Sequence, residues 1–374
     1  MQIGIIYLGR RGSGGPISFE LARHLTTYAQ VFAVLSQQAE SLDAWRASSL
    51  PWFEVPTYRS LPGAIWRWLN QTDLRRIAAQ IHLRQPDVLI YPMFYTLNPF
   101  LQRHLGDLPS LVAVHDPVPH PGAADRVYHL LENASIRQAT RCLIFSQRFT
   151  EDMQLRGARP GGIDYIPHGE LSYYQRVAAP SFQPEPPPEN TLLFFGRITA
   201  YKGLDVLLEA FHQVQMQRPA RLLIAGAGDL HPYQRLIRAT PGVELINRWI
   251  DEREVDGVFR QAKIAVLPYT SASQSGVLAI AASYALPVIA SRVGGIPEQI
   301  VDGVNGLLVD PGSVEQLAHA MLRLLDDPQL AVRLGVNLAD EHQNQRSWST
   351  IAEKVYAACE NAIRDHQSQN PAGG

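Results

Sequence analysis

The stretch from Leu192 to Phe211, LLFFGRITAYKGLDVLLEAF, places an apolar strand, a glycine turn and an amphipathic helix in direct succession. The apolar run ends at Gly196, and apolar residues then recur at helical spacing. The strand delivers Arg197 to its carboxyl end, and Lys202 follows at the start of the helix. Ligands of doubly wound α/β sheets bind beyond that edge, and two cations there favour a diphosphate. The stretch therefore predicts an α/β unit that binds an anion.

The same alternation of short apolar strands and helical patterns fills the rest of the chain. The predicted strands are 3–8, 31–35, 88–91, 111–114, 142–145, 192–195, 221–225, 243–246, 264–268, 288–290 and 306–309. The predicted helices are 17–28, 65–81, 127–139, 204–213, 254–261, 276–284, 314–325, 329–341 and 347–363. Short buried strands between helices indicate parallel sheets that are covered on both faces.

One proline-dense segment divides this pattern. Residues 180–190, PSFQPEPPPEN, contain almost no core-forming side chains and predict a semi-rigid linker. We therefore predict two doubly wound domains, 1–179 and 191–345, followed by a C-terminal helix over 346–365. The remaining residues, 366–374, are predicted to be a disordered tail.

Composition and charge exclude several classes of protein. The chain has 374 residues with 33 basic and 35 acidic side chains, so it lacks the basic excess of a nucleic-acid-binding protein. Cys142 and Cys359 are too few for a disulfide framework, and no Cys/His cluster predicts zinc. The N-terminal MQIGIIYLG is typical of a first strand rather than a signal peptide, and no apolar run approaches ~18 residues. We therefore expect a soluble protein of the cytoplasm.

The first predicted strand ends in a glycine-rich turn, GRRGSGGP, residues 9–16. A strand that runs through glycines into a helix offers backbone N–H groups to an anion. The turn is not a dinucleotide fingerprint, because Ile17 occupies the position of the third glycine and the second strand ends at Ser36 without an acidic residue. It predicts a phosphate or sugar loop, with a plain tight turn as the alternative.

A second motif is LPYTSASQSGVLAIAASYALPVIASRVGGIPEQIVDGVNGLLVDPG, from Leu267 to Gly312. It predicts a strand, a small polar loop and a helix whose N-terminus near Gly276 forms a second anion site. The phrases FFGRITAYKG, IAGAGD, ALPVIAS, GGIPEQIVDG and NGLLV resemble the C-terminal domain of family 4 retaining glycosyltransferases of the GT-B fold. The N-terminal half resembles that family more loosely, through the first turn, VAVHDPVPH and IPHG.

The resemblance covers nearly the whole chain. It implies two Rossmann-like domains that face each other across a cleft, with a last helix, beginning near Trp348, that crosses back to the first domain. It also implies retaining transfer of a sugar from a nucleotide-diphosphate donor, UDP- or GDP-linked, to a glycan or lipid-linked acceptor in polysaccharide or glycolipid biosynthesis. No metal and no other cofactor is expected.

The resemblance also assigns roles to individual residues. Arg197 and Lys202 would hold the diphosphate, together with backbone N–H groups of Ser275, Gly276 and Val277. Further donor contacts would come from Gly14 and Gly15 of the first turn, from Ile250 near the nucleobase, and from Ser273 and Gln274 at the sugar and ribose hydroxyls.

The sequence departs from the family pattern at one point. The family usually carries two glutamates eight residues apart, and the matching positions here are Ala272 and Ile280. The segment instead resembles a subgroup with a Gln-Ser-Gly turn, residues 274–276. The missing carboxylates leave two alternatives open, a nucleotide-sugar-binding relative without turnover and an epimerase of the same fold. A phosphorylase is disfavoured because the chain has only three lysines for a cofactor Schiff base.

The motif VAVHDPVPH places His115 and Asp116 at the end of a predicted parallel strand. That position favours a functional pair over a structural one, because the carboxyl ends of such strands line the binding edge. By resemblance His115 would touch the reacting sugar or stabilise developing charge, and Asp116 would orient His115 or the acceptor. For His168, in IPHGE, a loop role and a functional role are both open.

The segment from Ala64 to Arg84, AIWRWLNQTDLRRIAAQIHLR, combines tryptophans with arginines at helical spacing. A basic, tryptophan-bearing amphipathic helix can lie on a membrane surface. More often such a helix packs its apolar stripe on its own sheet. Both interpretations stay open, so the protein is expected either free in the cytoplasm or in peripheral contact with the inner face of the membrane.

Overall fold

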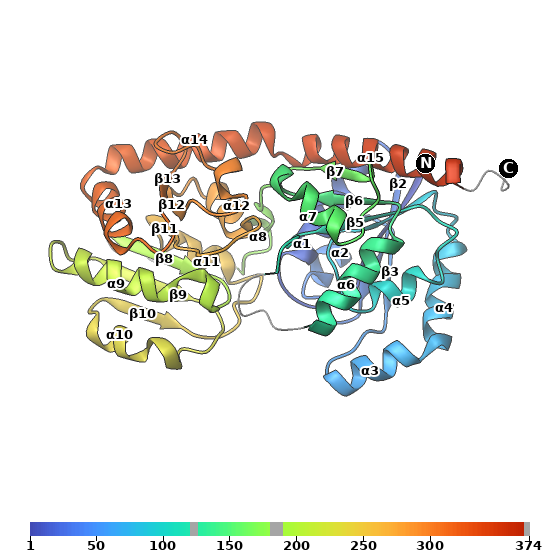
Figure 1. The fold of residues 1–374 in the computed structure, drawn as a ribbon, viewed down its shortest axis with the longest axis horizontal. Coiled ribbons are helices and arrows are strands. Elements are labelled where there is room, and N and C mark those ends of the chain that lie inside the picture. Colours follow the sequence, from blue (N-terminus) through green and yellow to red (C-terminus); the bar gives the residue numbers. More distant parts are fainter. Residues whose placement is uncertain (120–125, 180–189, 370–374) are drawn as a thin grey trace. The chain divides into compact units, whose positions relative to one another are not determined.

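The computed structural model describes residues 1–119, 126–179 and 190–369. They form two compact units (Figure 1), of which one comprises residues 1–119, 126–167 and 348–369 and the other residues 168–179 and 190–347. Each unit is built on a parallel sheet, which confirms the predicted α/β class with two doubly wound domains. The predicted linker over 180–190 lies, apart from Asn190, outside the described residues.

Within its described residues, the first unit contains a seven-stranded parallel sheet in the order β3-β2-β1-β4-β5-β6-β7. Its strands are β1 (Gln2–Tyr7), β2 (Gln30–Ser36), β3 (Trp52–Val55), β4 (Val88–Tyr91), β5 (Ser110–Val114), β6 (Arg141–Ile144) and β7 (Ile163–Tyr165). Its helices are α1 (Gly14–Leu25), α2 (Leu42–Arg46), α3 (Leu61–Leu69), α4 (Gln71–His82), α5 (Asn98–Gln102), α6 (Arg126–Gln138), α7 (Thr150–Leu155) and α15 (Trp348–Gln369). The central strands β1, β4 and β5 are buried almost throughout, as expected for strands covered on both faces.

The second unit has, over the residues described, six parallel strands in the order β10-β9-β8-β11-β12-β13. They are β8 (Thr191–Phe195), β9 (Arg221–Ala225), β10 (Val243–Ile246), β11 (Ile264–Leu267), β12 (Val288–Ser291) and β13 (Leu307–Val309). Its helices are α8 (Tyr173–Arg176), α9 (Leu204–Gln215), α10 (Gln234–Ala239), α11 (Val255–Arg260), α12 (Gly276–Ser283), α13 (Val314–Asp326) and α14 (Pro328–Gln345). Phe194, Phe211 and Met321 are fully buried in its core. Each such side chain stabilises the fold by about 1.5–3 kcal/mol.

The boundary between the units differs from the one predicted at residue 179. The Tyr173 hydroxyl donates to Glu252 over 2.8 Å, and the Gln175 amide donates to the Ser283 carbonyl over 2.7 Å. These contacts join the segment after Pro167 to the second unit. His168, expected near the end of the first domain, therefore belongs to the second.

Among the predicted helices, one is divided in the structure and another begins three residues earlier. The helix predicted over 65–81 is two helices, because Asn70 leaves the helical conformation and its side chain accepts from the Asp73 N–H to begin α4. The helix predicted from Ile17 begins at Gly14 instead. The glycine turn thus already forms the first turn of α1.

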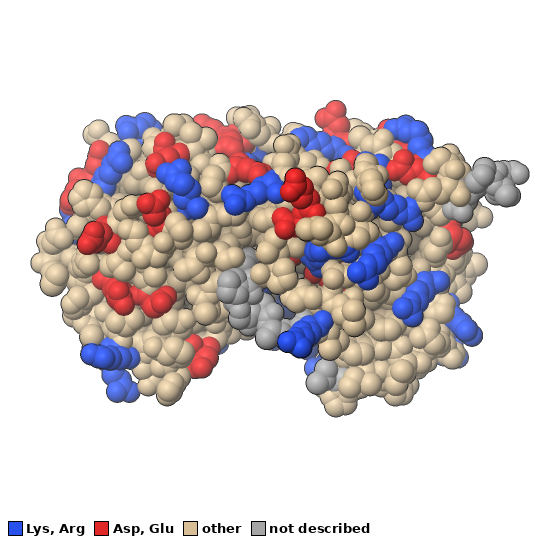
Figure 2. Space-filling view, in the orientation of Figure 1, with Lys and Arg blue, Asp and Glu red and all other residues tan. Residues whose placement is uncertain are grey.

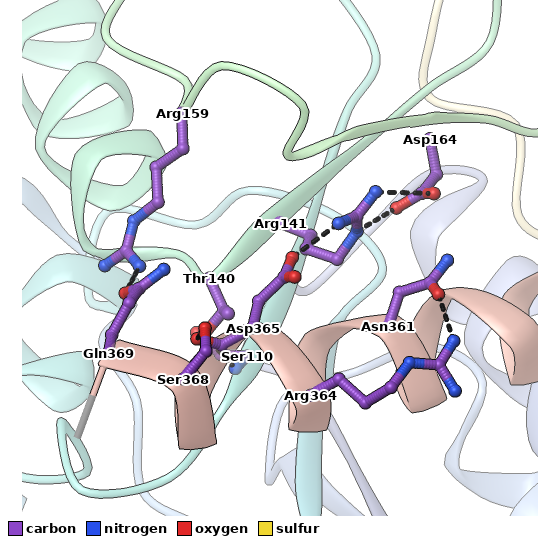
Figure 3. Close-up of polar contacts among 10 residues, drawn as sticks. All are labelled: Ser110, Thr140, Arg141, Arg159, Asp164, Asn361, Arg364, Asp365, Ser368 and Gln369. Carbon is purple, nitrogen blue, oxygen red and sulfur yellow. Dashed lines mark hydrogen bonds and ion pairs between the residues drawn. The ribbon is translucent and has the colours of Figure 1, made fainter. Parts of the chain in front are cut away.

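The C-terminal helix α15 packs on the first unit against α1, which confirms that the chain crosses back after Ser347. Asp365 of α15 pairs with Arg141, whose guanidinium also binds Asp164 over 2.7 and 3.0 Å, and Gln369 bonds Arg159 (Figure 3). These contacts hold the last turns as helix, so the prediction of disorder from residue 366 is wrong for 366–369. Residues 370–374 lie outside the described chain.

Candidate active site

The second unit has its topological switch point between the neighbouring strands β8 and β11. The chain leaves β8 toward β9 and β10 on one side, and β11 begins the run toward β13 on the other, so the two strands flank the topological switch point. Lys202 follows β8, and its Nζ donates to the hydroxyl of Tyr269, just after β11, over 3.1 Å. Ligands of doubly wound sheets bind at this point. Lys202 therefore lies at the edge of the sheet formed by the carboxyl ends of β8 and β11.

The backbone after β8 is shaped around this lysine. Gly196 has φ +109°, and a Cβ there would lie 3.0 Å from the Lys202 Nζ. A side chain at Gly196 would thus be strained and would crowd the ammonium. Lys202 is nearly buried, at 8% exposure, whereas Arg197 is exposed and forms no ion pair with the described residues. One cation is fixed, and the other is available to a ligand.

The N-terminus of α12 lies next to the same network. Ser275 caps the helix by accepting from the Leu278 N–H, and its own N–H donates to Gln299 Oε1 over 3.1 Å. The Ser275 side chain also hydrogen-bonds the Tyr269 hydroxyl. Tyr269 therefore connects the ammonium of Lys202 with the positive end of the α12 dipole. Burial raises the pKa of Tyr269, so its hydroxyl stays protonated at neutral pH.

Gly276, the first residue of α12, is not required by packing. A Cβ there would meet only His168, whose Nε2 would be 3.6 Å away, an ordinary contact. By contrast, a Cβ at Gly14 would lie 2.6 Å from the Tyr7 ring, so the fold itself requires that glycine. The missing side chain at Gly276 leaves the helix N-terminus open to a close approach by another group.

The first unit has its own switch point, between β1 and β4. Gly14 begins α1 directly after β1, and a Cβ there would also lie 3.1 Å from Met93, which follows β4. His115 at the end of β5 donates from Nε2 to the Pro92 carbonyl over 3.0 Å. The structure thus brings Gly14 and His115 to adjoining loops of one sheet edge, with Gly15 buried in the first turn of α1.

His115 is held as a neutral imidazole. It is 9% exposed, its ring lies 4.3 Å from the ring of Phe145, and burial lowers its pKa. Because the Pro92 carbonyl can only accept, Nε2 carries the proton. Burial therefore favours the neutral form of His115.

Arg156 fixes the loop that carries His115 and Asp116. Its guanidinium donates to the carbonyls of Asp116 and Pro117 over 3.1 and 3.2 Å. The same group pairs with the buried Glu132 and with Asn133 over 2.5 and 2.7 Å. A carbonyl clamp of this kind was not predicted from the sequence, because the partners lie 40 and 24 residues from Arg156.

Two families match the chain, one for each unit. The family described as "Glycosyl transferase 4-like domain" matches residues 18–169, and "Glycosyl transferases group 1" matches residues 189–327. Both matched families are glycosyltransferase domains, and together the two matches cover most of the chain.

Curated proteins similar to this chain are named as glycosyltransferases. A D-inositol 3-phosphate glycosyltransferase of Corynebacterium glutamicum is 34% identical over 190 residues, 46% of this chain and 44% of the relative. An alpha-D-kanosaminyltransferase of Streptomyces kanamyceticus is 25% identical over 83% of this chain and 87% of its own length. The match to the inositol-phosphate enzyme spans less than half of that protein.

Solved structures of similar fold cover almost the whole chain. Anabaena HepE in complex with UDP has a TM-score of 0.71 at 17% identity, over 96% of this chain and 100% of HepE. Sucrose-phosphate synthase of Thermosynechococcus elongatus has 0.72 at 18%, over 97% and 99%. These neighbours confirm the two-domain GT-B fold.

The structure places the other predicted donor residues as follows. Ser273 is buried, and Gln274 is half-buried with an Oε1 that has no hydrogen-bond partner among the described residues. Val277 is half-buried in the first turn of α12. Ile250 is buried after β10, which lies two strands from β8, and its role at the nucleobase stays a prediction.

A metal site was not expected from the sequence. Over residues 1–119, 126–179 and 190–369, no group of three or more His, Cys, Asp or Glu side chains is arranged to hold a metal ion.

Proposed function

We propose that the chain transfers a sugar from a nucleotide-diphosphate donor to an acceptor hydroxyl. The observation that carries the proposal is the buried Lys202 at the β8/β11 switch point, linked through Tyr269 to the N-terminus of α12. A cation and a helix N-terminus at one sheet edge are two sources of positive potential for a diphosphate. Structures of HepE hold UDP and UDP-glucose, which supports the same donor class here.

The transfer breaks the bond between the sugar C1 and a diphosphate oxygen and forms a bond from C1 to the acceptor oxygen. The leaving diphosphate gains negative charge as its bond breaks. Lys202, Arg197 and the backbone N–H groups of Gly276 and Val277 would stabilise that charge. The Ser275 N–H, also predicted for this role, already donates to Gln299 Oε1. If configuration is retained, the acceptor arrives on the face from which the diphosphate departs, and a diphosphate oxygen can take the hydroxyl proton.

His115 and Asp116 are proposed to act on the sugar and the acceptor. Both belong to the first unit, where Arg156 fixes their loop through two backbone carbonyls. A neutral imidazole suits hydrogen bonding to sugar hydroxyls rather than charge pairing with the diphosphate. Gly14 and Gly15 at the start of α1 would add backbone donors for the donor phosphates.

We further propose that the reaction needs no metal ion. Two side-chain cations and a helix N-terminus can neutralise the diphosphate in place of a divalent ion. Turnover should therefore survive an excess of EDTA. Loss of turnover with EDTA and its recovery with manganese would contradict this.

A binding protein without turnover is the second candidate. Ala272 and Ile280 stand where the family usually has glutamates, and both are buried apolar residues. A screen of UDP-, GDP- and ADP-sugars by thermal shift would identify the donor, since a ligand at ~100 times its Kd adds roughly 2.7 kcal/mol. Product formation from that donor with glycan or lipid-linked acceptors would then support the transferase. Donor binding with neither transfer nor donor hydrolysis would favour the second candidate.

A further inference from the structure

Helix α3 of the first unit presents three large apolar side chains to solvent. Ile65, Trp66 and Leu69 are 46%, 56% and 76% exposed. Positions i, i+1 and i+4 lie on one side of a helix, so the three form a single apolar face. In the described part of the chain this is a concentrated patch, because it falls within one turn and a half of one helix.

The opposite side of α3 is anchored to its own domain. Ala64 is 1% exposed, and the Trp68 ring stacks on Phe100 at a centroid distance of 6.0 Å. At the helix end Arg67 pairs with Asp73 of α4. The apolar face is therefore presented by a fixed helix, and it is not the inner side of a loosely packed segment.

The surroundings of this face are basic. Residues 59–84 contain five arginines and one aspartate, an excess of four positive charges in a chain whose net charge is −2. Asp73 is paired with Arg67 and lies 3.8 Å from Arg76. Arg59, Arg75 and Arg76 are exposed. Around α3, at the lower right of Figure 2, the visible surface is uncharged or basic.

We propose that α3 lies on the surface of an anionic phospholipid bilayer. Ile65, Trp66 and Leu69 enter the boundary between headgroups and acyl chains, where tryptophan places its apolar body in lipid and its N–H in water. Arg59, Arg75 and Arg76 contact the lipid phosphates. None of the described helices is long and apolar enough to cross a bilayer, so the contact is peripheral. The proposal does not depend on the transfer reaction.

Sedimentation of the full chain with large vesicles tests this surface. We expect binding to vesicles of phosphatidylglycerol and phosphatidylcholine in equal parts, and little binding to phosphatidylcholine alone. The triple variant Ile65→Ser, Trp66→Ser, Leu69→Ser should lose binding. Arg75→Gln with Arg76→Gln should weaken the partition coefficient by about tenfold or more at low salt.

The matched controls are exposed apolar residues elsewhere. Leu155 and Met216 are 87% and 71% exposed, and Leu155→Ser with Met216→Ser should leave vesicle binding unchanged. Trp66→Phe should retain binding and abolish the blue shift of tryptophan emission that vesicles produce.

Three results would overturn the proposal. They are no binding of the wild type to the anionic vesicles, equal binding by the triple variant, and a concentration-dependent self-association that the triple variant removes. The last would assign the face to a second copy of the chain instead. Unchanged circular dichroism and thermal melting of the triple variant would show that its loss of binding is not a loss of fold.

Discussion

Replacing Lys202 by methionine separates a binding role from a folding role. Methionine keeps most of the length of the side chain and removes its charge. Lys202 is 8% exposed, and its ammonium donates to Tyr269 over 3.1 Å. Burying an ammonium costs free energy that an apolar side chain of similar size avoids. We therefore expect Lys202→Met to melt at the same temperature as the wild type or higher.

The same change should weaken nucleotide binding strongly. Two unit charges ~4 Å apart at an effective dielectric of ~20 interact by about 4 kcal/mol, which is an upper limit. Hydrogen bonds to charged groups contribute roughly 1.5–3 kcal/mol in mutational series. That range corresponds to a rise in Kd of about 10- to 150-fold. Because the leaving diphosphate gains charge in the transition state, kcat should fall as well.

Calorimetry with the free nucleoside diphosphate measures the first effect without any acceptor. Lys263→Met is the matched control, because Lys263 is an exposed lysine of the same unit, and it should bind as the wild type does. Wild-type affinity in Lys202→Met would refute the assignment. A large fall in melting temperature together with the loss of binding would instead make Lys202 a structural residue.

Four other changes test the remaining site and its environment. Gly276→Ala should be neutral or stabilise the protein by about 0.4–1 kcal/mol, because alanine loses less backbone entropy on folding than glycine. The same change should raise the Kd of the nucleoside diphosphate several-fold, and an unchanged Kd would mean that no ligand approaches the start of α12. His115→Ala should lower kcat on the order of 100-fold with little change in nucleotide affinity, and near-normal turnover would make the histidine structural. Arg156→Lys keeps the charge but loses part of the guanidinium fork that donates to two backbone carbonyls. In steady-state kinetics kcat should fall about tenfold, whereas the nucleotide Kd measured by calorimetry should stay constant. Burial lowers the pKa of His342 to about 3, against about 6.5 in the unfolded chain. Between these pH values only the unfolded chain binds the proton, so the free energy of unfolding falls as the pH drops below 6.5, by about 2 kcal/mol at pH 5. The melting temperature of His342→Gln should therefore fall less between pH 7.5 and pH 5 than that of the wild type.

The central strands could be predicted from the sequence because burial on both faces gives continuous apolar runs. β1 and β8 lie within one or two residues of their predicted limits. The edge strands β3 and β7 were missed, since most of their residues are only half-buried and leave no such run. The break at Asn70 was missed because it depends on a side-chain cap, and apolar spacing alone does not show it.

The candidate site likewise combines residues that the sequence could predict with residues that it could not. Gly196, Lys202 and Ser275 could be predicted because each stands next to a strand end or a helix start in the sequence itself. Tyr269 and Gln299 could not, since they act through contacts with Lys202 and Ser275 that span 67 and 24 residues. Nothing local in the sequence marks a side chain whose function depends on which loop the fold places beside it.

The missing carboxylates are best understood through packing. Ala272 and Ile280 are 6% and 4% exposed. A glutamate at either position would bury its carboxyl group, either charged or protonated, at a cost of several kcal/mol. The backbone at Gly294 also packs closely against this loop, because Gly294 has φ +51° and a Cβ there would lie 1.5 Å from the Ala272 carbonyl oxygen. Restoring a glutamate at position 272 or 280 alone would therefore destabilise the domain. If the proposed donor binds at this loop, its sugar and ribose hydroxyls would meet neutral groups, and Gln274, whose buried Oε1 has no partner among the described residues, would offer an acceptor.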